Sequence, residues 1–264
     1  MVIEEKTTKN RYTWVEVPKT IYTTAKSSTD YGNIEKDMQT YASAYRGAYT
    51  DNWSSEAQHG FTSKEKYDEH KNKMLKSVYE HGGFWISQYE IGYEETTIRT
   101  GKTDDTGLVQ KPVSKEGAYP YNWVTCKQAQ KLATQMGTEE YTSSLMFGIQ
   151  WDLMLNHLET KGNWNHENPS EYYLKTNSNS WGNYYNPEFD ITKGKYSIDY
   201  GKNFLNITQS GYKKPLNTSV LLTTGASSRN CFLNIYDLAG NLYEWTLEKT
   251  TTAAQPCSQR GRRI

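Results

Sequence analysis

Length and composition indicate one large domain with few aliphatic residues. The chain has 264 residues, of which 35% are hydrophobic and 14% are aromatic. Its core must therefore use large rings whose polar edges need partners. At this length a single domain buries roughly three quarters of the surface of the unfolded chain. Thirty basic and thirty acidic residues cancel, so no net field favours nucleic acid or an anionic membrane as a partner.

Neither a signal peptide nor a membrane span is recognisable. The start of the chain lacks a basic stretch followed by an apolar one, and no window approaches the ~18 apolar residues of a spanning helix. We therefore expect no membrane insertion and a location in the cytoplasm or in a phage virion. Cys126, Cys231 and Cys257 are widely spaced. They form neither a disulfide framework nor a Cys-x-x-Cys metal pair, which predicts reduced thiols.

The first third of the chain predicts a tail, a strand and an insertion. Residues 1–10 are charged and irregular, and we expect a disordered tail. Residues 12–17 alternate as a strand does, and Pro18 can end that strand. Residues 23–60 are polar with few aliphatic side chains, and they predict an insertion with at most one short helix, near residues 33–44.

The next signals predict a helix followed directly by a strand. Residues 62–65 fit a capping box, and apolar side chains recur on one face until Gly82 and Gly83 stop the helix. A strand is expected over residues 84–91. Residues 94–119 are a polar loop with little to bury.

Two further helices are expected in the middle of the chain. Thr125 can cap the first with Gln128 as its reciprocal partner, and Gly137 offers a left-handed exit. Residues 145–158 are hydrophobic nearly all round, which indicates a buried helix. Residues 162–218 then show no clear period, and residues 220–222 predict a short strand.

The most constrained segment is Asn234-Ile-Tyr-Asp-Leu-Ala-Gly-Asn-Leu-Tyr-Glu-Trp245. Its acids bracket a Gly-Asn turn, so the carboxylates of Asp237 and Glu244 could surround one hard cation with the carbonyls of Gly240 and Leu242. Calcium is such an ion. A hairpin corner with solvated acids is the alternative, since this kind of turn forms without a metal.

This segment resembles the core motif of formylglycine-generating, or sulfatase-modifying-factor, domains, which reads roughly Gly-Leu-Tyr-Asp-Met-Ala-Gly-Asn-Val-Trp-Glu-Trp. Residues 83–91 are similar to the family strand Gly-Phe-Tyr-Ile-Gly-Lys-Tyr-Glu-Val, and residues 11–18 to its opening Phe-Val-Trp-Val-Pro. Residues 122–125 stand where the family has Val-Thr-Trp before its first helix. The resemblance is colinear over about residues 11–261.

The resemblance implies an α+β fold of the C-type lectin-like kind. Low regular secondary structure is expected, with two or three helices around small antiparallel sheets. It also implies a single domain over residues 11–261, which contains the insertion at residues 23–60, and a divergent end at residues 262–264. The C-terminal part of the family pattern is missing after Arg260-Gly261, through truncation, supply from elsewhere or a native shorter form.

The resemblance also bears on chemistry. Family enzymes oxidise a substrate cysteine with copper, held by a cysteine pair that follows an Arg-Gly-Gly segment. Arg260 and Gly261 stand at that segment, but no cysteine pair follows them, so we expect no copper. A related branch carries a three-histidine iron site, often with His-x-x-x-His, a spacing that none of the five histidines here has. We expect no iron. The resemblance favours structural calcium at Asp237, Gly240, Leu242 and Glu244.

The leading functional hypothesis is a non-catalytic ligand- or receptor-binding protein on this scaffold. It resembles phage or Gram-positive bacterial members, including targets of diversity-generating retroelements, and the expected partner is a protein or a glycan. Candidate binding residues are the aromatic side chains of a polar segment, Trp164, Trp181, Tyr184 and Tyr185. The alternatives are a formylglycine-generating oxidoreductase that matures sulfatases and a purely structural phage or surface component. The oligomeric state is open.

Overall fold

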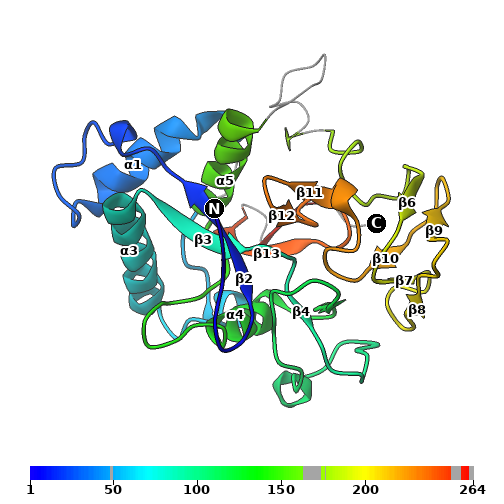
Figure 1. The fold of residues 1–264 in the computed structure, drawn as a ribbon. Helices are drawn as coiled ribbons and strands as arrows, with labels where there is room; N and C mark the ends of the chain where they lie inside the picture. The colour runs from blue at the N-terminus through cyan, green and yellow to red at the C-terminus, as the bar shows by residue number, and fades with distance from the viewer. Residues whose placement is uncertain (48–49, 163–173, 176, 251–256, 262–264) are drawn as a thin grey trace.

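The protein is an α+β molecule with helices packed beside several small antiparallel sheets. The computed structural model describes residues 1–47, 50–162, 174–175, 177–250 and 257–261. Figure 1 shows α1, α3 and α5 on one side of β2 and β3, and the short strands β6 to β10 on the other. No helix in these described ranges has the length and apolar character that crossing a membrane requires.

The central sheet joins the start of the chain to the strand after α3. Its order is β1 (Val2–Glu4), β2 (Arg11–Glu16) and β3 (Gly83–Ser87), and all pairs are antiparallel. Val2 pairs with Thr13 and Trp14 with Trp85. The strand expected at residues 12–17 is present one residue earlier, and the strand expected at residues 84–91 is present in shorter form. The start of the chain differs from the disordered tail that we expected, because β1 adds backbone hydrogen bonds to the edge of β2.

Five α-helices and four 3-10 turns form the described helical part of the chain. The helices are α1 (Tyr31–Tyr41), α2 (Glu56–His59), α3 (Lys64–His81), α4 (Cys126–Thr134) and α5 (Gly148–Lys161). The turns are η1 (Lys19–Ile21), η2 (Ser43–Tyr45), η3 (Asp105–Gly107) and η4 (Ser228–Asn230). The insertion contains α1 close to its expected place, but the expectation of at most one helix there was wrong, because α2 also lies within residues 23–60. The helix α5 falls on the segment expected to be a buried helix.

The remaining strands are short and pair in small antiparallel sets. They are β4 (Gly92–Tyr93) with β5 (Tyr119–Pro120), β6 (Phe189–Ile191) with β9 (Tyr212–Lys214), β7 (Lys195–Ser197) with β8 (Leu205–Asn206) and β10 (Leu221–Leu222), β11 (Cys231–Phe232) with β12 (Ile235–Tyr236), and β13 (Glu244–Lys249) with β14 (Cys257–Arg260). Strands of two or three residues are too short to show a period, which explains why β6 to β9 were not predicted within residues 162–218.

Capping residues fix the ends of the two best predicted helices. Thr125 Oγ1 accepts from the Gln128 amide at 3.2 Å and Gln128 Oε1 accepts from the Thr125 amide at 3.0 Å, which confirms the capping box of α4. Ser63 caps α3, one residue later than the predicted box, and Gly82 ends it with φ of 74°. The predicted exit at Gly137 was wrong, because α4 ends at Thr134 and Gly137 does not adopt a positive φ.

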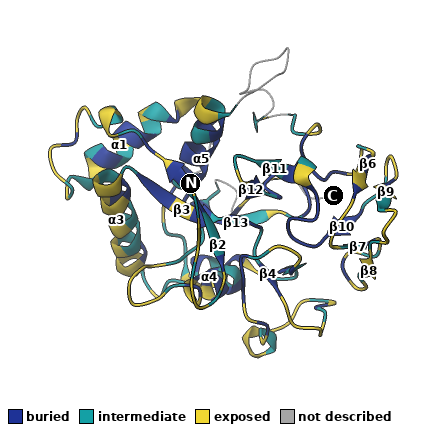
Figure 2. Ribbon diagram, viewed as in Figure 1, coloured by how far each residue is buried: buried dark blue, intermediate teal, exposed yellow. Residues whose placement is uncertain are grey.

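The main core lies between the central sheet, α3 and α5. Val15, Phe84 and Ile86 face inward from β2 and β3, while α5 contributes Leu153 and Leu158. The opposite sheet face carries Tyr12, Trp14 and Trp85, of which Trp85 is 39% exposed. Figure 2 shows the dark blue of buried residues along α5 and the yellow of exposed residues along the outer side of α3. One face of the central sheet is therefore open.

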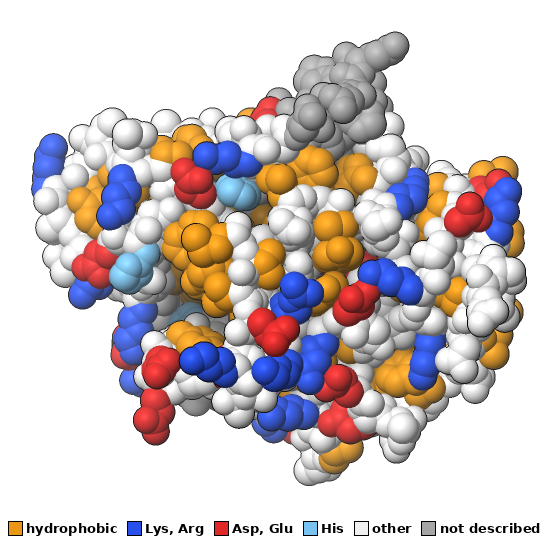
Figure 3. All heavy atoms as spheres, in the orientation of Figure 1, with side chains coloured by type: hydrophobic (Ala, Val, Ile, Leu, Met, Phe, Trp, Pro, Cys, Tyr) orange, Lys and Arg blue, Asp and Glu red, His pale blue; other side chains and the backbone are white. Residues whose placement is uncertain are grey.

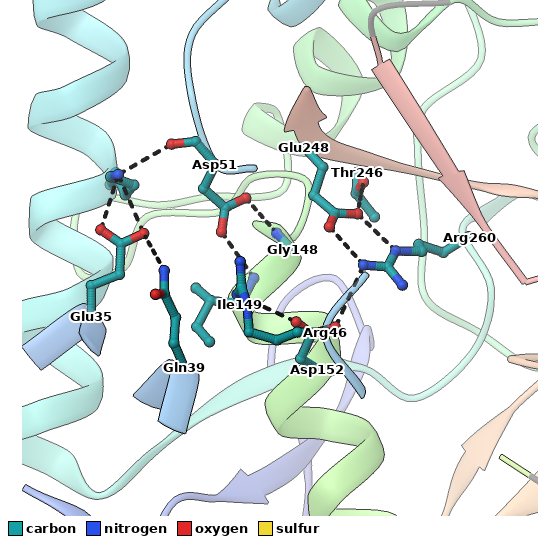
Figure 4. Close-up of polar contacts among 11 residues, drawn as sticks. Glu35, Gln39, Arg46, Asp51, Gly148, Ile149, Asp152, Thr246, Glu248 and Arg260 are labelled. Atoms are coloured by element: carbon teal, nitrogen blue, oxygen red, sulfur yellow. Dashed lines mark hydrogen bonds and ion pairs between the residues drawn. The ribbon is translucent and has the colours of Figure 1, made fainter. Parts of the chain in front are cut away.

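A buried charge network ties the insertion to α5 and the last two strands (Figure 4). Asp51 accepts from the amides of Gly148 at 2.7 Å and Ile149 at 2.9 Å, and so caps the start of α5. Arg260 donates to both oxygens of Glu248 at 2.7 Å and 2.6 Å. Such bidentate contacts to buried carboxylates are strong and directional.

Asp152 is the shared acid of this network. Its carboxylate lies 3.4 Å from Arg260 and 3.5 Å from Arg46, and only 2% of its side chain is exposed. Burial raises the pKa of Asp152 to about 7 in spite of the two guanidiniums. Burial likewise raises the pKa of Asp51 to about 6 against the two amides that lower it. The folded state thus holds protons that the unfolded chain releases near pH 4.

We predict that this network makes the protein less stable as pH rises from about 4 to 7. A carboxyl with a raised folded pKa binds more protons in the folded state, so the free energy of unfolding falls across that window and levels off above pH 7. Chemical denaturation of the wild type and of Asp152→Asn at pH 5 and pH 8 measures the effect. We compare the unfolding free energy of Asp152→Asn with that of the wild type at each pH. Relative to the wild type, the variant should gain roughly 2–4 kcal/mol between pH 5 and pH 8.

Buried histidines such as His70, whose pKa is lowered by burial, change stability with pH in the opposite direction. Their contribution is the same in the wild type and in Asp152→Asn, so the difference between the two proteins does not contain it. Lys193 and Glu116 pair at the surface, each 45% exposed. Glu116→Gln should therefore follow the wild-type pH profile. A pH-independent difference between Asp152→Asn and the wild type would contradict the assignment.

Candidate functional site

The candidate site is the corner where β12 turns into β13. Three residues of this turn have positive φ angles, namely Asp237 at 60°, Gly240 at 80° and Asn241 at 64°. A Cβ at Gly240 would lie 1.9 Å from the Asn183 carbonyl oxygen, so only glycine fits there. Asn183 donates its amide to the Ala239 carbonyl at 3.0 Å and accepts from the Asn241 amide at 2.9 Å. These two backbone hydrogen bonds hold the turn against the segment around Asn183, which is distant in sequence.

The side chain of Asn241 holds three segments together inside this corner. Its Oδ1 accepts from Asn183 Nδ2 at 3.0 Å and from the Leu222 amide at 2.9 Å. Its Nδ2 donates to Glu90 Oε2 at 2.7 Å. An amide side chain supplies both acceptor and donor, so Asn241 positions a carboxylate that lies far away in sequence.

Asp237 is fully buried at the centre of the corner. Its Oδ2 accepts from the Gly225 amide at 2.6 Å, while Oδ1 has no hydrogen-bond partner in the described residues. Burial raises the pKa of Asp237 to about 7 against the Gly225 hydrogen bond, which lowers it. A buried acceptor without a partner is costly and indicates that something else supplies the donor or the positive charge.

Two glutamates extend the acidic character of the corner. Neither carboxylate oxygen of Glu244 has a hydrogen-bond partner in the described part of the chain, although both are buried. Burial and then the neighbouring Glu90 raise the pKa of Glu244, and burial and then Asp237 raise the pKa of Glu90. Sequence reasoning missed Glu90 because its place beside the corner depends on the Asn241 contact rather than on any local spacing.

The donor set of this corner fits a hard cation in chemical type. Asp237 Oδ1 and both oxygens of Glu244 are carboxyl oxygens that are buried and without hydrogen-bond partners in the described residues, and oxygen ligands of this kind suit calcium. The described residues contain no group of three or more histidine, cysteine, aspartate or glutamate side chains close enough to hold an ion by themselves. The carbonyls of Gly240 and Leu242 would have to complete the expected set.

The corner lines a large groove of ≈ 2160 Å³. The central sheet, α3, α4, residues 140–146 and part of α5 line its other sides. The aromatic lining includes Trp14 and Trp85, whose rings meet edge to face at 5.0 Å, and Tyr243, which is 40% exposed. Figure 3 shows hydrophobic side chains gathered over β2 and β3 on this face.

Trp123 marks backbone strain in the same groove. It has φ of 61°, a left-handed conformation that is unusual for a bulky residue. Its indole nitrogen is buried and has no hydrogen-bond partner in the described residues. Residues held in such conformations concentrate at functional sites, so Trp123 belongs to the candidate site, and no feature of the sequence pattern had pointed to it.

The predicted aromatic binding residues do not form a common surface. Trp181 and Tyr184 are 9% and 6% exposed and pack in the main core, which corrects the expectation that they contact a ligand. Tyr185 is 50% exposed. Trp164 lies outside the described residues. None of the three described rings lines the groove.

The cysteines and histidines occupy separate places. Cys126 Sγ donates to the Thr246 carbonyl oxygen at 3.6 Å, whereas Cys231 is in β11. The side chain of Cys257 lies outside the described part. His59 is buried in α2 and stacks on Tyr67 at 5.2 Å.

No protein-family profile, curated protein or solved structure matches this chain. The geometry of the corner and groove is therefore what supports a functional assignment.

We predict that Gly240→Ala destabilises the protein by roughly 3 kcal/mol or more, because it adds a clash with backbone to a strained φ. Gly32→Ala is the matched control, since a Cβ at Gly32 in α1 meets nothing within 4 Å. That control should leave stability unchanged or raise it by up to ~1 kcal/mol. Urea denaturation of both variants measures the difference, and equal stabilities would show that the Asn183 contact does not constrain the corner.

Proposed function

We propose that this protein is a non-catalytic binding protein on a formylglycine-generating-enzyme-like scaffold, and that its groove receives a protein or glycan ligand. The observation that carries the proposal is the open, aromatic face of the central sheet beside a corner with unsatisfied polar atoms. Rigid amphipathic rings give a large contact area with little loss of side-chain entropy. Exposed apolar surface in a concave site is typical of ligand binding.

The placement of the strands explains why these rings are available. Tyr12 and Trp14 alternate with Thr13 and Val15 along β2, and only the second pair is buried. Trp85 pairs with Trp14 across the strands, so its ring lies on the same face. No described helix covers that face, whereas α5 packs on the opposite one. A ligand that buries these rings gains hydrophobic free energy that the folded chain has not used.

The oxidoreductase alternative would need a thiol pair. Cys126 and Cys231 lie in α4 and β11, and each makes its own local contacts. Burial raises the pKa of Cys231, which disfavours the thiolate that copper prefers. The raised pKa of Cys231 is the feature that favours the binding function over the oxidase.

Calcium is the structural ion that we propose for the corner. Asp237 and Glu244 would hold it with the carbonyls of Gly240 and Leu242, and its charge would offset the burial that raises both carboxyl pKa values. When bound, calcium supplies rigidity and charge neutralisation. The chain itself holds the turn through Asn183 and Asn241.

Removal of calcium should lower the melting temperature by several degrees, for a loss of about 1–3 kcal/mol in a domain of this size. Differential scanning calorimetry with EDTA and with added calcium measures this change. Asp237→Asn should be insensitive to both additions, because it lacks one of the two anionic ligands. Identical melting of the wild type with and without the chelator would remove calcium from the site.

The groove predicts which substitutions abolish ligand binding. Ligands selected from a glycan array or a displayed-peptide library should lose about tenfold or more in affinity for Trp85→Ser, since a large ring at the centre of a contact contributes at least 1–2 kcal/mol. Tyr185→Ser removes an equally exposed ring outside the groove and should bind as the wild type does. If the selected ligands bind Trp85→Ser normally and lose affinity for Tyr185→Ser, the binding surface lies outside the groove.

A further inference from the structure

We propose that the groove binds a primary ammonium group, presented by a lysine side chain of a protein ligand, and that Glu90 is its anchor. This inference rests on the proposed binding function and names the ligand chemistry of the same site. It also gives a role to an acid that the proposed calcium set leaves out.

Glu90 is a positioned carboxylate on the wall of the groove. Asn241 Nδ2 fixes its Oε2 at 2.7 Å, and Asn241 is itself fixed by Asn183 and the Leu222 amide. The carboxylate therefore does not have to be ordered when a ligand arrives. Preorganised groups of this kind bind at lower entropic cost than free surface side chains.

The charge around Glu90 is complementary to a cation. Fully buried Asp237 also lines the groove, and its Oδ1 has no partner among the described residues. Glu5, Glu140 and Glu244 are the other acids along the groove, against the lysines Lys73 and Lys102. Lys73 is already paired with Glu69 at 3.1 Å. A positive group entering the groove thus meets more acidic than basic side chains, and Glu90 is the positioned acid that lies outside the proposed calcium set.

Aromatic rings in the same groove add to this attraction. The faces of tryptophan rings attract cations through their quadrupole, by about 0.5–2 kcal/mol depending on desolvation. Trp14, Trp85 and Trp123 all line the groove. An aliphatic stem can pack against these rings while its charged end reaches the acids, and a lysine side chain combines the two properties.

The contacts of Glu90 favour an ammonium over a guanidinium. Arginine recognises a carboxylate best through two parallel hydrogen bonds, one to each oxygen. One oxygen of Glu90 already accepts from Asn241. A point charge that uses the second oxygen alone matches this geometry, and an ammonium is such a group.

The test is a titration of the full chain with small probes, followed by tryptophan fluorescence and NMR. The probes are N-acetyl-lysine amide, its neutral Nε-acetylated form, N-acetyl-arginine amide, and chitosan oligomers as an amino-sugar source. We expect the lysine probe to perturb tryptophan signals, and the neutral form to bind roughly tenfold more weakly or worse. Glu90→Gln should lose the preference while keeping the Asn241 contact through its side-chain oxygen.

Matched controls keep the outcome clear. Glu188→Gln removes an exposed acid outside the groove, which pairs with Lys213 at 2.7 Å, and should bind as the wild type does. Melting of Glu90→Gln at the wild-type temperature would exclude misfolding as the cause of lost binding.

Several results would overturn the inference. The first is equal binding of the charged and neutral lysine probes, and the second is a loss of lysine binding in Glu188→Gln as large as in Glu90→Gln. The third is displacement of the lysine probe by calcium. The last two are tighter binding of the arginine probe or of the amino sugar than of the lysine probe. Each of these leaves the proposed function standing if Trp85→Ser still abolishes binding of selected ligands. If the proposed function is wrong, all selected ligands should bind Trp85→Ser with the affinity that they have for the wild type.

Discussion

The contact between two asparagines, Asn183 and Asn241, is the constraint on which the candidate site depends. It joins a segment before β6 to the turn before β13, and through Leu222 and Glu90 it fixes two further parts of the chain. Each of these amides is buried, so every hydrogen bond it makes also avoids the cost of an unsatisfied polar group. The corner needs these hydrogen bonds because it is surrounded by short strands and loops that make few aliphatic contacts.

Buried charge is the second organising feature of the molecule. The network around Asp152 uses two guanidiniums to hold acids from α5 and β13, and the corner around Asp237 has acids without such partners. The first cluster is internally paired, which is typical of structural ion pairs. The acids of the second cluster form no ion pair with a described lysine or arginine, and that difference is why we assign ligand chemistry to the corner and a structural role to the network.

Local signals in the sequence predicted the elements that depend on local physics. The capping box at Thr125, the alternation along residues 12–17 and the apolar run of α5 each correspond to an element of the structure. Residues 1–10 were mispredicted because pairing with β2, a tertiary contact, makes them a strand. Trp181 and Tyr184 were expected at the surface because polar residues surround them, but burial depends on packing partners that the pattern does not contain.

The site itself was predictable only in part. The turn residues and carboxylates of residues 234–245 are visible as a motif, whereas Glu90, Asn183 and Trp123 reach the site through long-range folding. Their local sequence contains no period, cap or charge pair that indicates this role. The formylglycine-generating-type fold remains a proposal beyond the coarser α+β architecture.

The position of Arg260 has a consequence for how the chain folds. Asp152 and Glu248 depend on this late residue for a counter-charge, and Thr13 near the start donates to the Asn234 carbonyl at 2.9 Å. Pairings between distant parts of a chain slow folding, because loop closure comes before the contacts that reward it. As the chain leaves the ribosome, Asp152 of α5 therefore has only Arg46 as a counter-charge until β14 supplies Arg260.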